Sequence, residues 1–218
     1  MKIWKRILVL FLAPVFALSS SFSAFALESV EISPMSIVGQ NTLLQMRSYL
    51  TTQYNNSSSN ANISQNAGYL FALKAIAYAI AGTSYSTMDC SKLTYTALKE
   101  AYASKALQNY YIFGNTKLSS RQQYSACVSN NLMITRSDLQ TGDLIFWENP
   151  SAGVVNHVGI YFKYNGGDYV IESRSPGVVV TDWIWDNDEY KPKYYARINK
   201  ALTATFKTGA PFREALGT

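Results

Sequence analysis

The sequence is poor in the residues that build metal and disulfide sites. It contains one histidine and two cysteines in 218 residues, and only 15% of its residues are charged. A single histidine excludes a multi-histidine metal centre, and two cysteines allow at most one disulfide bond. No metal or organic cofactor is implied by the sequence.

Long apolar runs are also missing, except at the N-terminus. The chain opens with the basic stretch MKIWKR, continues as ILVLFLAPVFAL, and reaches an A-x-A sequence at 24–26. This order is typical of a secretory signal peptide, so we expect residues 1–26 to be removed. An uncleaved anchor fits less well, because the apolar run contains Pro14 and is shorter than the ~20 residues that a spanning helix needs. No cysteine stands at the cleavage site, as a lipoprotein would require. We expect a secreted or cell-wall-associated protein without stable membrane insertion.

Signal removal also changes the charge balance. The net charge of +5 falls to +2 when Lys2, Lys5 and Arg6 leave. This small excess does not indicate nucleic-acid binding. Subtracting 26 from 218 residues leaves 192, which is enough for one full-sized domain with a buried core.

The remaining chain divides by composition. Residues 27–65 combine an expected helix at 28–54 with the polar tract NNSSSNANISQN, which reads as a linker or surface loop. That helix either packs on the main domain or acts as a spacer. We expect the main domain at 66–200 and a C-terminal tail at 201–218.

Within the main domain, predicted helices come before predicted strands. An apolar helix is expected at 67–81 and a second helix from Asp89, followed by loops with a possible short helix at 105–138. The short β-branched and aromatic runs come next: DLIFWE, VVNHVGIYFKY, DYVIES, GVVVTDW and YYARIN. This order predicts an α+β fold, in which an antiparallel sheet packs on the helix that begins near Cys90.

Cys90 is the candidate nucleophile. It directly follows Asp89, a good N-cap, so it lies in the first turn of the expected helix. The unpaired N–H groups of a helix start favour a thiolate, and the N–H of Cys90 itself offers a donor to an oxyanion. A buried inert cysteine, or a disulfide with Cys127, would explain the same residue. The local pattern alone does not choose among these interpretations.

His157 is the only histidine, and hence the only candidate for a histidine base. Strand alternation places it on the face opposite Val158. Glu172 ends the next predicted strand, which would form a hairpin with the His157 strand through KYNGGD, so this carboxylate is the candidate that orients the imidazole. Asp168 is the competing carboxylate, although it reads as a turn residue. Ordinary surface roles remain open for His157 and Glu172.

Several motifs occur in a recognisable order: AGTSY, DCSKL, TGDLIFW, NHVGIYF, and YVIES followed by GVVV. Together, over about 69–198, they resemble the NlpC-type cell-wall cysteine peptidases, a bacterial branch of the papain-like superfamily. The resemblance implies a papain-like fold, with Cys90 as nucleophile, His157 as general base and Glu172 as the third polar residue. The implied partner is peptidoglycan or its peptide fragments.

The resemblance also assigns residues around the nucleophile. Tyr85 is similar to a tyrosine that helps to form the oxyanion site. Asp89 and Ser91 flank the nucleophile, where the family uses such residues to help bind the free amine of a stem peptide.

Three departures affect the expected substrate. Lys92 replaces the glycine that usually follows Asp-Cys-Ser, the segment from Tyr85 to Cys90 is short and lacks a Trp-Gly-Gly stretch, and Glu172 stands where histidine is commoner. We expect a secreted cysteine peptidase or amidase that acts on peptidoglycan stem peptides. The alternatives are an amidase or acyltransferase-like relative acting on another amide or ester, and an inactive cell-wall-binding module.

Overall fold

The computed structural model describes residues 37–59, 63–103, 105–108, 110–182 and 192–202. The expected signal peptide, and the expected tail beyond residue 202, lie outside these ranges. Within them, no helix is both long enough and apolar enough to cross a membrane.

Helices precede most of the strands in the chain. The helices are α1 (Gln40–Ser59), α2 (Ile63–Ile80), α3 (Cys90–Ala101), α4 (Lys105–Gln108) and α5 (Ser120–Ser129), with the 3₁₀ turns η1 (Arg136–Asp138) and η2 (Ile198–Ala201). The strands are β1 (Met133–Ile134), β2 (Leu144–Asn149), β3 (Val154–Tyr164), β4 (Gly167–Arg174), β5 (Gly177–Asp182) and β6 (Pro192–Ala196).

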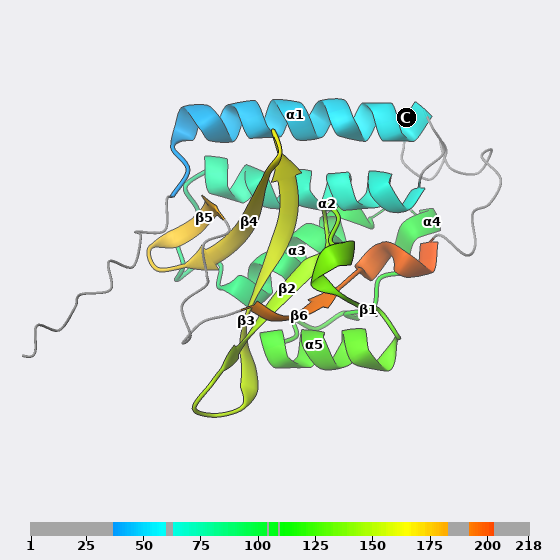
Figure 1. Cartoon of the computed structure of the whole chain (residues 1–218), viewed down its shortest axis with the longest axis vertical. Helices are drawn as coiled ribbons and strands as arrows, with labels where there is room; N and C mark the ends of the chain where they lie inside the picture. The colour runs from blue at the N-terminus through cyan, green and yellow to red at the C-terminus, as the bar shows by residue number, and fades with distance from the viewer. Residues whose placement is uncertain (1–36, 60–62, 104, 109, 183–191, 203–218) are drawn as a thin grey trace, which may run out of the picture. The chain divides into compact units, whose positions relative to one another are not determined.

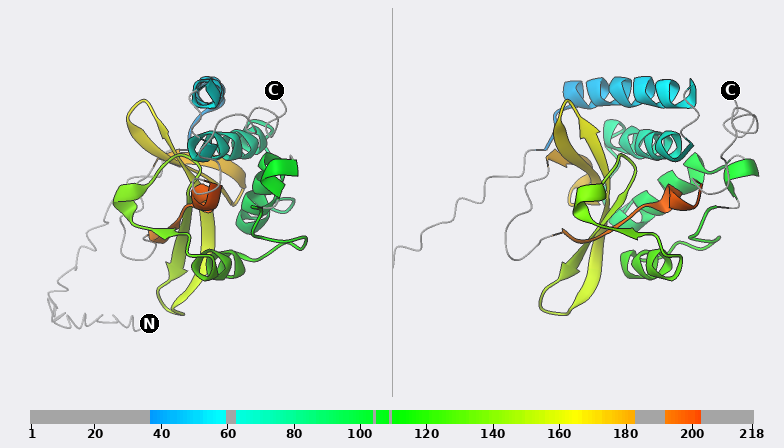
Figure 2. Two further views of the ribbon diagram at one scale, coloured as in Figure 1. Left: turned by 90° about the vertical axis from the view of Figure 1, so that its right-hand side faces the viewer. Right: turned by 45° about the vertical axis from the view of Figure 1, so that its right-hand side comes forward.

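The strands form one antiparallel sheet in the order β1-β6-β2-β3-β4-β5. Helices α2 and α3 pack against each other and against this sheet, and α1 packs on α2. Figure 2 shows α1 and α5 at opposite ends of the sheet. The expected papain-like α+β fold, with Cys90 opening a helix that packs on the sheet, is confirmed.

The core explains why α2 is apolar on nearly all sides. The helix has α1, α3 and the sheet as neighbours, so most of its surface is covered. Its Phe71 and Ile76 are at most 1% exposed, and Leu93 of α3 and Phe146 of β2 are fully buried. Burying each such side chain stabilises the fold by about 1.5–3 kcal/mol.

The polar tract NNSSSNANISQN, residues 55–66, is helical in its described parts, 55–59 and 63–66, where we expected a linker or loop. Helix α1 continues through Ser59, and α2 already begins at Ile63. The buried Asn66 side chain donates hydrogen bonds to the Tyr54 carbonyl (2.8 Å) and to the Ser57 hydroxyl (3.1 Å). These contacts satisfy the amide nitrogen of Asn66, whereas its Oδ1 is buried without a hydrogen-bond partner among the described residues. Of the two roles left open for the first helix, the structure shows packing on the domain.

Helix α5 lies in the region 105–138, where we expected loops with a possible short helix. A capping box begins it: the Ser119 hydroxyl accepts from the Gln122 N–H (3.3 Å), and the Gln122 side chain accepts from the Ser119 N–H (2.9 Å). The sequence Ser-x-x-Gln is a recognised helix-start signal. The ten residues of α5 could therefore have been predicted from the sequence.

The hairpin between β3 and β4 has a two-residue turn. Asn165 and Gly166 both have positive φ, 49° and 83°, as a type I′ turn requires. The Asn-Gly pair therefore fixes the register, which places Tyr164 opposite Gly167 and Gly159 opposite Glu172. The hairpin expected from KYNGGD is confirmed.

A close backbone approach joins α2 to the segment before β2. A Cβ atom added at Gly68 would lie 2.2 Å from the Thr141 carbonyl oxygen and 3.3 Å from the Asn199 side chain. Real Cβ atoms do not approach a backbone oxygen so closely. A glycine is therefore required at this point of α2.

We predict that Gly68→Ala lowers the free energy of unfolding by roughly 1–3 kcal/mol, because the added methyl forces the backbone apart. The better helix propensity of alanine offsets part of this loss. Gly39→Ala is the matched control, since nothing lies within 4 Å of a Cβ there. Urea unfolding measures both variants, and equal stabilities would contradict the close approach.

Candidate active site

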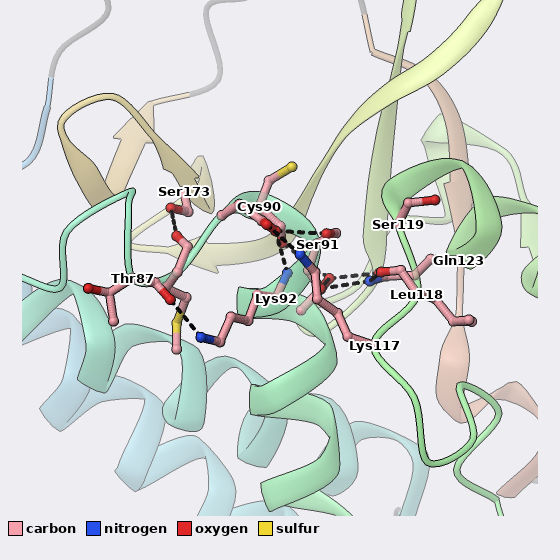
Figure 3. Close-up of polar contacts among 12 residues, drawn as sticks. Thr87, Cys90, Ser91, Lys92, Lys117, Leu118, Ser119, Gln123 and Ser173 are labelled. Atoms are coloured by element: carbon pink, nitrogen blue, oxygen red, sulfur yellow. Dashed lines mark hydrogen bonds and ion pairs between the residues drawn. The ribbon is translucent and has the colours of Figure 1, made fainter.

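Cys90 is the first residue of α3, as the sequence predicts. The helix is capped by Asp89, whose Oδ1 accepts hydrogen bonds from the Lys92 N–H (2.8 Å) and from the Ser91 hydroxyl (2.7 Å). The cap satisfies one of the orphan donors of the helix start and fixes its first turn. Figure 3 shows the Cys90 sulfur pointing away from the polar contacts of its neighbours.

Strand β4 anchors the segment that leads to Cys90. The buried Ser173 hydroxyl donates to the carbonyl of Met88, two residues before the cysteine (Figure 3). Ser173 follows Glu172 in the same strand. One strand thus holds the backbone ahead of Cys90 and also carries the candidate carboxylate.

The Glu172 carboxylate forms a hydrogen bond with the His157 ring. The Nε2 atom of the histidine lies 2.6 Å from Oε2 of the glutamate, which is fully buried. The other oxygen, Oε1, accepts from the Thr181 hydroxyl (3.0 Å) and lies 3.8 Å from the Arg174 guanidinium. A buried carboxylate is tolerated only when it is paired in this way.

The register shows how the glutamate reaches the histidine. Glu172 is opposite Gly159, two residues beyond His157, so its side chain crosses the sheet diagonally. Gly159 leaves room for this crossing because it has no side chain. A Cβ atom added at this position would lie 2.5 Å from the Val170 side chain and 3.3 Å from the Trp147 indole. Trp147 is 1% exposed. The centroid of its ring lies 5.1 Å from the centroid of the His157 ring, with an angle of 54° between the two ring planes. The indole therefore fills the space beside the imidazole.

His157 also hydrogen-bonds the Cys90 side chain. Because Nε2 faces Glu172, the remaining ring nitrogen, Nδ1, is the one available to the sulfur. Burial lowers the pKa of His157, but the hydrogen bonds and charges of Cys90 and Glu172 raise it more strongly, to about 9. The ring is thus held as an imidazolium at neutral pH.

The competing carboxylate, Asp168, lies elsewhere. It sits opposite Lys163 near the hairpin turn and accepts a hydrogen bond from the Tyr161 hydroxyl at 2.5 Å. Lys163 lies six residues beyond His157 along β3, which is a distance of about 20 Å. Of the two candidates, the structure brings only Glu172 to the histidine.

The other predicted residues lie around the start of α3. The Tyr85 side chain is 44% exposed. The backbone N–H of Tyr85 donates a hydrogen bond to the Pro176 carbonyl at 2.9 Å. Ser91 is buried beneath the helix cap. The Lys92 ammonium turns back to the Thr87 carbonyl (2.7 Å), as Figure 3 shows.

Two residues at this end of α3 were missed by the sequence analysis. Gln123 of α5 is fully buried, and its side-chain amide donates to the carbonyls of Ser91 (2.7 Å) and Leu118 (3.1 Å). Lys117, just before α5, forms an ion pair with Asp89. Only the capping box of α5 could have pointed to this region, by placing Gln123 in a first helical turn.

The second cysteine has a different environment. Cys127 lies in α5, fully buried, and burial raises the pKa of its thiol to about 12. Both cysteines are free, so no disulfide joins Cys90 to Cys127. Among the described residues, no group of three His, Cys, Asp or Glu side chains could hold a metal ion.

Comparison with known proteins finds a family match that covers Cys90, His157 and Glu172. The NlpC/P60 family matches residues 75–197, more than half of the chain. The chain is 28% identical over 130 residues to the "Murein DD-endopeptidase MepS/Murein LD-carboxypeptidase" of Escherichia coli (strain K12), covering 60% of this chain and 58% of that protein. It is 30% identical over 132 residues to the "Probable endopeptidase p60" of Listeria grayi, covering 60% of this chain and 22% of the relative.

The single histidine allows its protonation to be followed directly. We predict that the one imidazole signal in NMR titrates near pH 9, and that Glu172→Gln moves this titration down toward the ordinary value of 6.5, because the variant removes a negative charge that stabilises the imidazolium. Glu100→Gln, an exposed carboxylate change at the far end of α3, is the control and leaves the titration unchanged. A wild-type titration near 6.5 would contradict the proposed pairing.

Proposed function

Because the chain belongs to the NlpC/P60 family, we propose that it is an extracytoplasmic cysteine hydrolase that cleaves amide bonds in peptidoglycan stem peptides. The hydrogen-bonded series from Cys90 through His157 to Glu172 carries this proposal. The names of the similar proteins, which refer to murein and to endopeptidases, support the choice of substrate.

The first half of the reaction forms a thioester. His157 holds the proton of Cys90, and the thiolate attacks the carbonyl carbon of the scissile amide, so that a C–S bond forms. The oxyanion accepts hydrogen bonds from the N–H of Cys90 at the helix start and from the Tyr85 hydroxyl. When the C–N bond breaks, His157 gives its proton to the departing amine.

The second half releases the acid. His157 takes a proton from water, the resulting hydroxide attacks the thioester carbon, and the C–S bond breaks to regenerate the cysteine. Glu172 does not exchange protons in this scheme. Its buried carboxylate holds the ring orientation and stabilises the imidazolium that each step requires.

Export fits the same function, since peptidoglycan lies outside the cytoplasmic membrane. We propose that residues 1–26 direct secretion and that the mature protein acts in or near the cell wall. The basis is the order of basic, apolar and A-x-A segments at the N-terminus.

Incubation of purified protein with isolated cell walls tests the hydrolase. We predict that Cys90→Ala lowers the release of new amine ends at least about 10³-fold, because no other group can form the thioester. Cys127→Ala is the matched control and retains activity, since Cys127 lies in the core. Equal release by Cys90→Ala and wild type would exclude the mechanism, and the masses of the products distinguish a stem-peptide bond from another amide or ester.

Alkylation separates a hydrolase from a module that only binds the wall. We predict that iodoacetamide at neutral pH labels Cys90 much faster than Cys127, which is fully buried with a raised thiol pKa. His157→Gln should slow the labelling of Cys90, because the imidazolium that favours the thiolate is lost. Peptide mass spectrometry over time measures both rates. Slow labelling of Cys90 in the wild type would favour the inactive module.

A further inference from the structure

The chain just before α1 pairs with the edge of the sheet. The Val38 N–H donates a hydrogen bond to the Val180 carbonyl at 2.9 Å, and an antiparallel bridge joins Ile37 to Thr181. β5, which contains Val180 and Thr181, is the edge strand. In Figure 1 the chain runs from this edge into the start of α1. Residues 37–39, which we call the arm, therefore cover backbone groups that an edge strand would otherwise expose.

The arm is fixed at its other end by α1. The side chain of Gln40, the first residue of this helix, donates to the Ile80 carbonyl at the end of α2 at 3.0 Å. Met46 and Leu50 of α1 are fully buried in the core. The arm thus connects a helix that is anchored in the domain to the edge of the sheet. Both the arm and α1 come before residue 75, where the family match begins.

Thr181 links the same part of β5 to the carboxylate of the site. It is fully buried, and its hydroxyl donates to Oε1 of Glu172 at 3.0 Å, whereas the Arg174 guanidinium is farther from this oxygen, at 3.8 Å. Val179 is directly opposite Glu172, and Thr181 is two residues farther along, so its side chain lies on the same face of the sheet. The other oxygen, Oε2, bonds His157. Each oxygen of the carboxylate therefore has its own close partner.

The hydroxyl fixes the rotation of this carboxylate. The terminal torsion of a glutamate side chain is broad and roughly two-fold, so hydrogen bonds rather than rotamer preference set the plane of the carboxylate. With Oε1 held by Thr181, Oε2 is directed at Nε2 of His157. The position of Thr181 depends in turn on an edge strand, which has a neighbouring strand on one side and the arm on the other.

We propose that Thr181 is a positioning residue that directs the Glu172 carboxylate at His157, and that the arm holds Thr181 in place. The arm and α1 are then part of the working enzyme, although they lie outside the part of the chain that the family match covers. The catalytic consequence rests on the proposed function, whereas the effect on the imidazole can be measured without a substrate.

Thr181→Val tests the hydroxyl, because valine has a similar shape and no donor. We expect the release of amine ends from isolated cell walls to fall roughly three- to tenfold, the range for one hydrogen bond. The NMR titration of His157 should move down from about pH 9 by at least about 0.5, since the Glu172 carboxylate is no longer held against the ring. Thr181→Ser keeps the donor and should restore both. Thr94→Val is the matched control: it removes another fully buried hydroxyl, which bonds Gln123 at 2.7 Å, and should leave the titration unchanged.

Two measurements test the arm. The Val38 N–H should be protected from hydrogen exchange in the wild type, because it bonds the Val180 carbonyl. Val38→Pro removes this N–H and should shift the His157 titration in the same direction as Thr181→Val, whereas Val38→Ala keeps the N–H and should not. Added to Thr181→Val, the proline should shift the titration no further, because the hydroxyl through which the arm acts is already gone.

The outcomes are distinct. If Thr181→Val keeps the wild-type titration, or Thr181→Ser fails to restore it, the role of Thr181 is rejected. If the Val38 amide exchanges as fast as that of an unstructured peptide, or Val38→Pro shifts the titration equally with and without Thr181→Val, the role of the arm is rejected. Should Val38→Pro not fold, the exchange rate of the wild type decides. If the wild type releases no amine ends from cell walls while the titrations behave as expected, the proposed function fails and the positioning of the carboxylate stands.

Discussion

The site depends on one buried negative charge. Glu172 has no exposure to solvent, so its carboxylate is stable only with partners, and it has three: His157, Thr181 and Arg174. These residues come from β3, β5 and β4 itself, so the central part of the sheet must be assembled before the charge is satisfied. Burial lowers the pKa of His157, but the interactions of Cys90 and of this carboxylate together raise it to about 9, so the imidazole is held as a cation at neutral pH.

Strand β4 joins the two halves of the site because successive side chains point to opposite faces of a sheet. Glu172 faces the histidine, whereas Ser173 faces the helices and bonds the carbonyl of Met88, two residues before the cysteine. A shift of this strand would therefore disturb both the contact that holds the base and the contact that holds the segment before the nucleophile. Gly159, which lies opposite the glutamate, and Trp147, whose ring lies beside the imidazole, complete the arrangement.

Features encoded by short sequence patterns were predicted from the sequence. Asp89 before Cys90 located the start of α3, and Asn165-Gly166 gave the hairpin that brings Glu172, rather than Asp168, to His157. Contacts between distant segments were not predicted. The Gln123 side chain donates a hydrogen bond to the carbonyl of Ser91, 32 residues earlier in the chain. Lys117 forms an ion pair with the carboxylate of Asp89, 28 residues earlier. Neither partner can be identified until α3 and α5 are packed, and the helical polar tract likewise depends on the packing of α1 on α2.

The turn at Asn165-Gly166 has a role that its position does not suggest. It lies at the far end of the hairpin from His157, yet its two-residue length sets which residue of β4 stands opposite Gly159. Because strand side chains alternate with a period of two, a single-residue insertion in this turn would slip the ladder by one position. The glutamate would then face the helices and Ser173 would face the imidazole. The length of a surface turn is therefore part of the chemistry of the site, so that indels there should be far less neutral than those in an ordinary exposed loop.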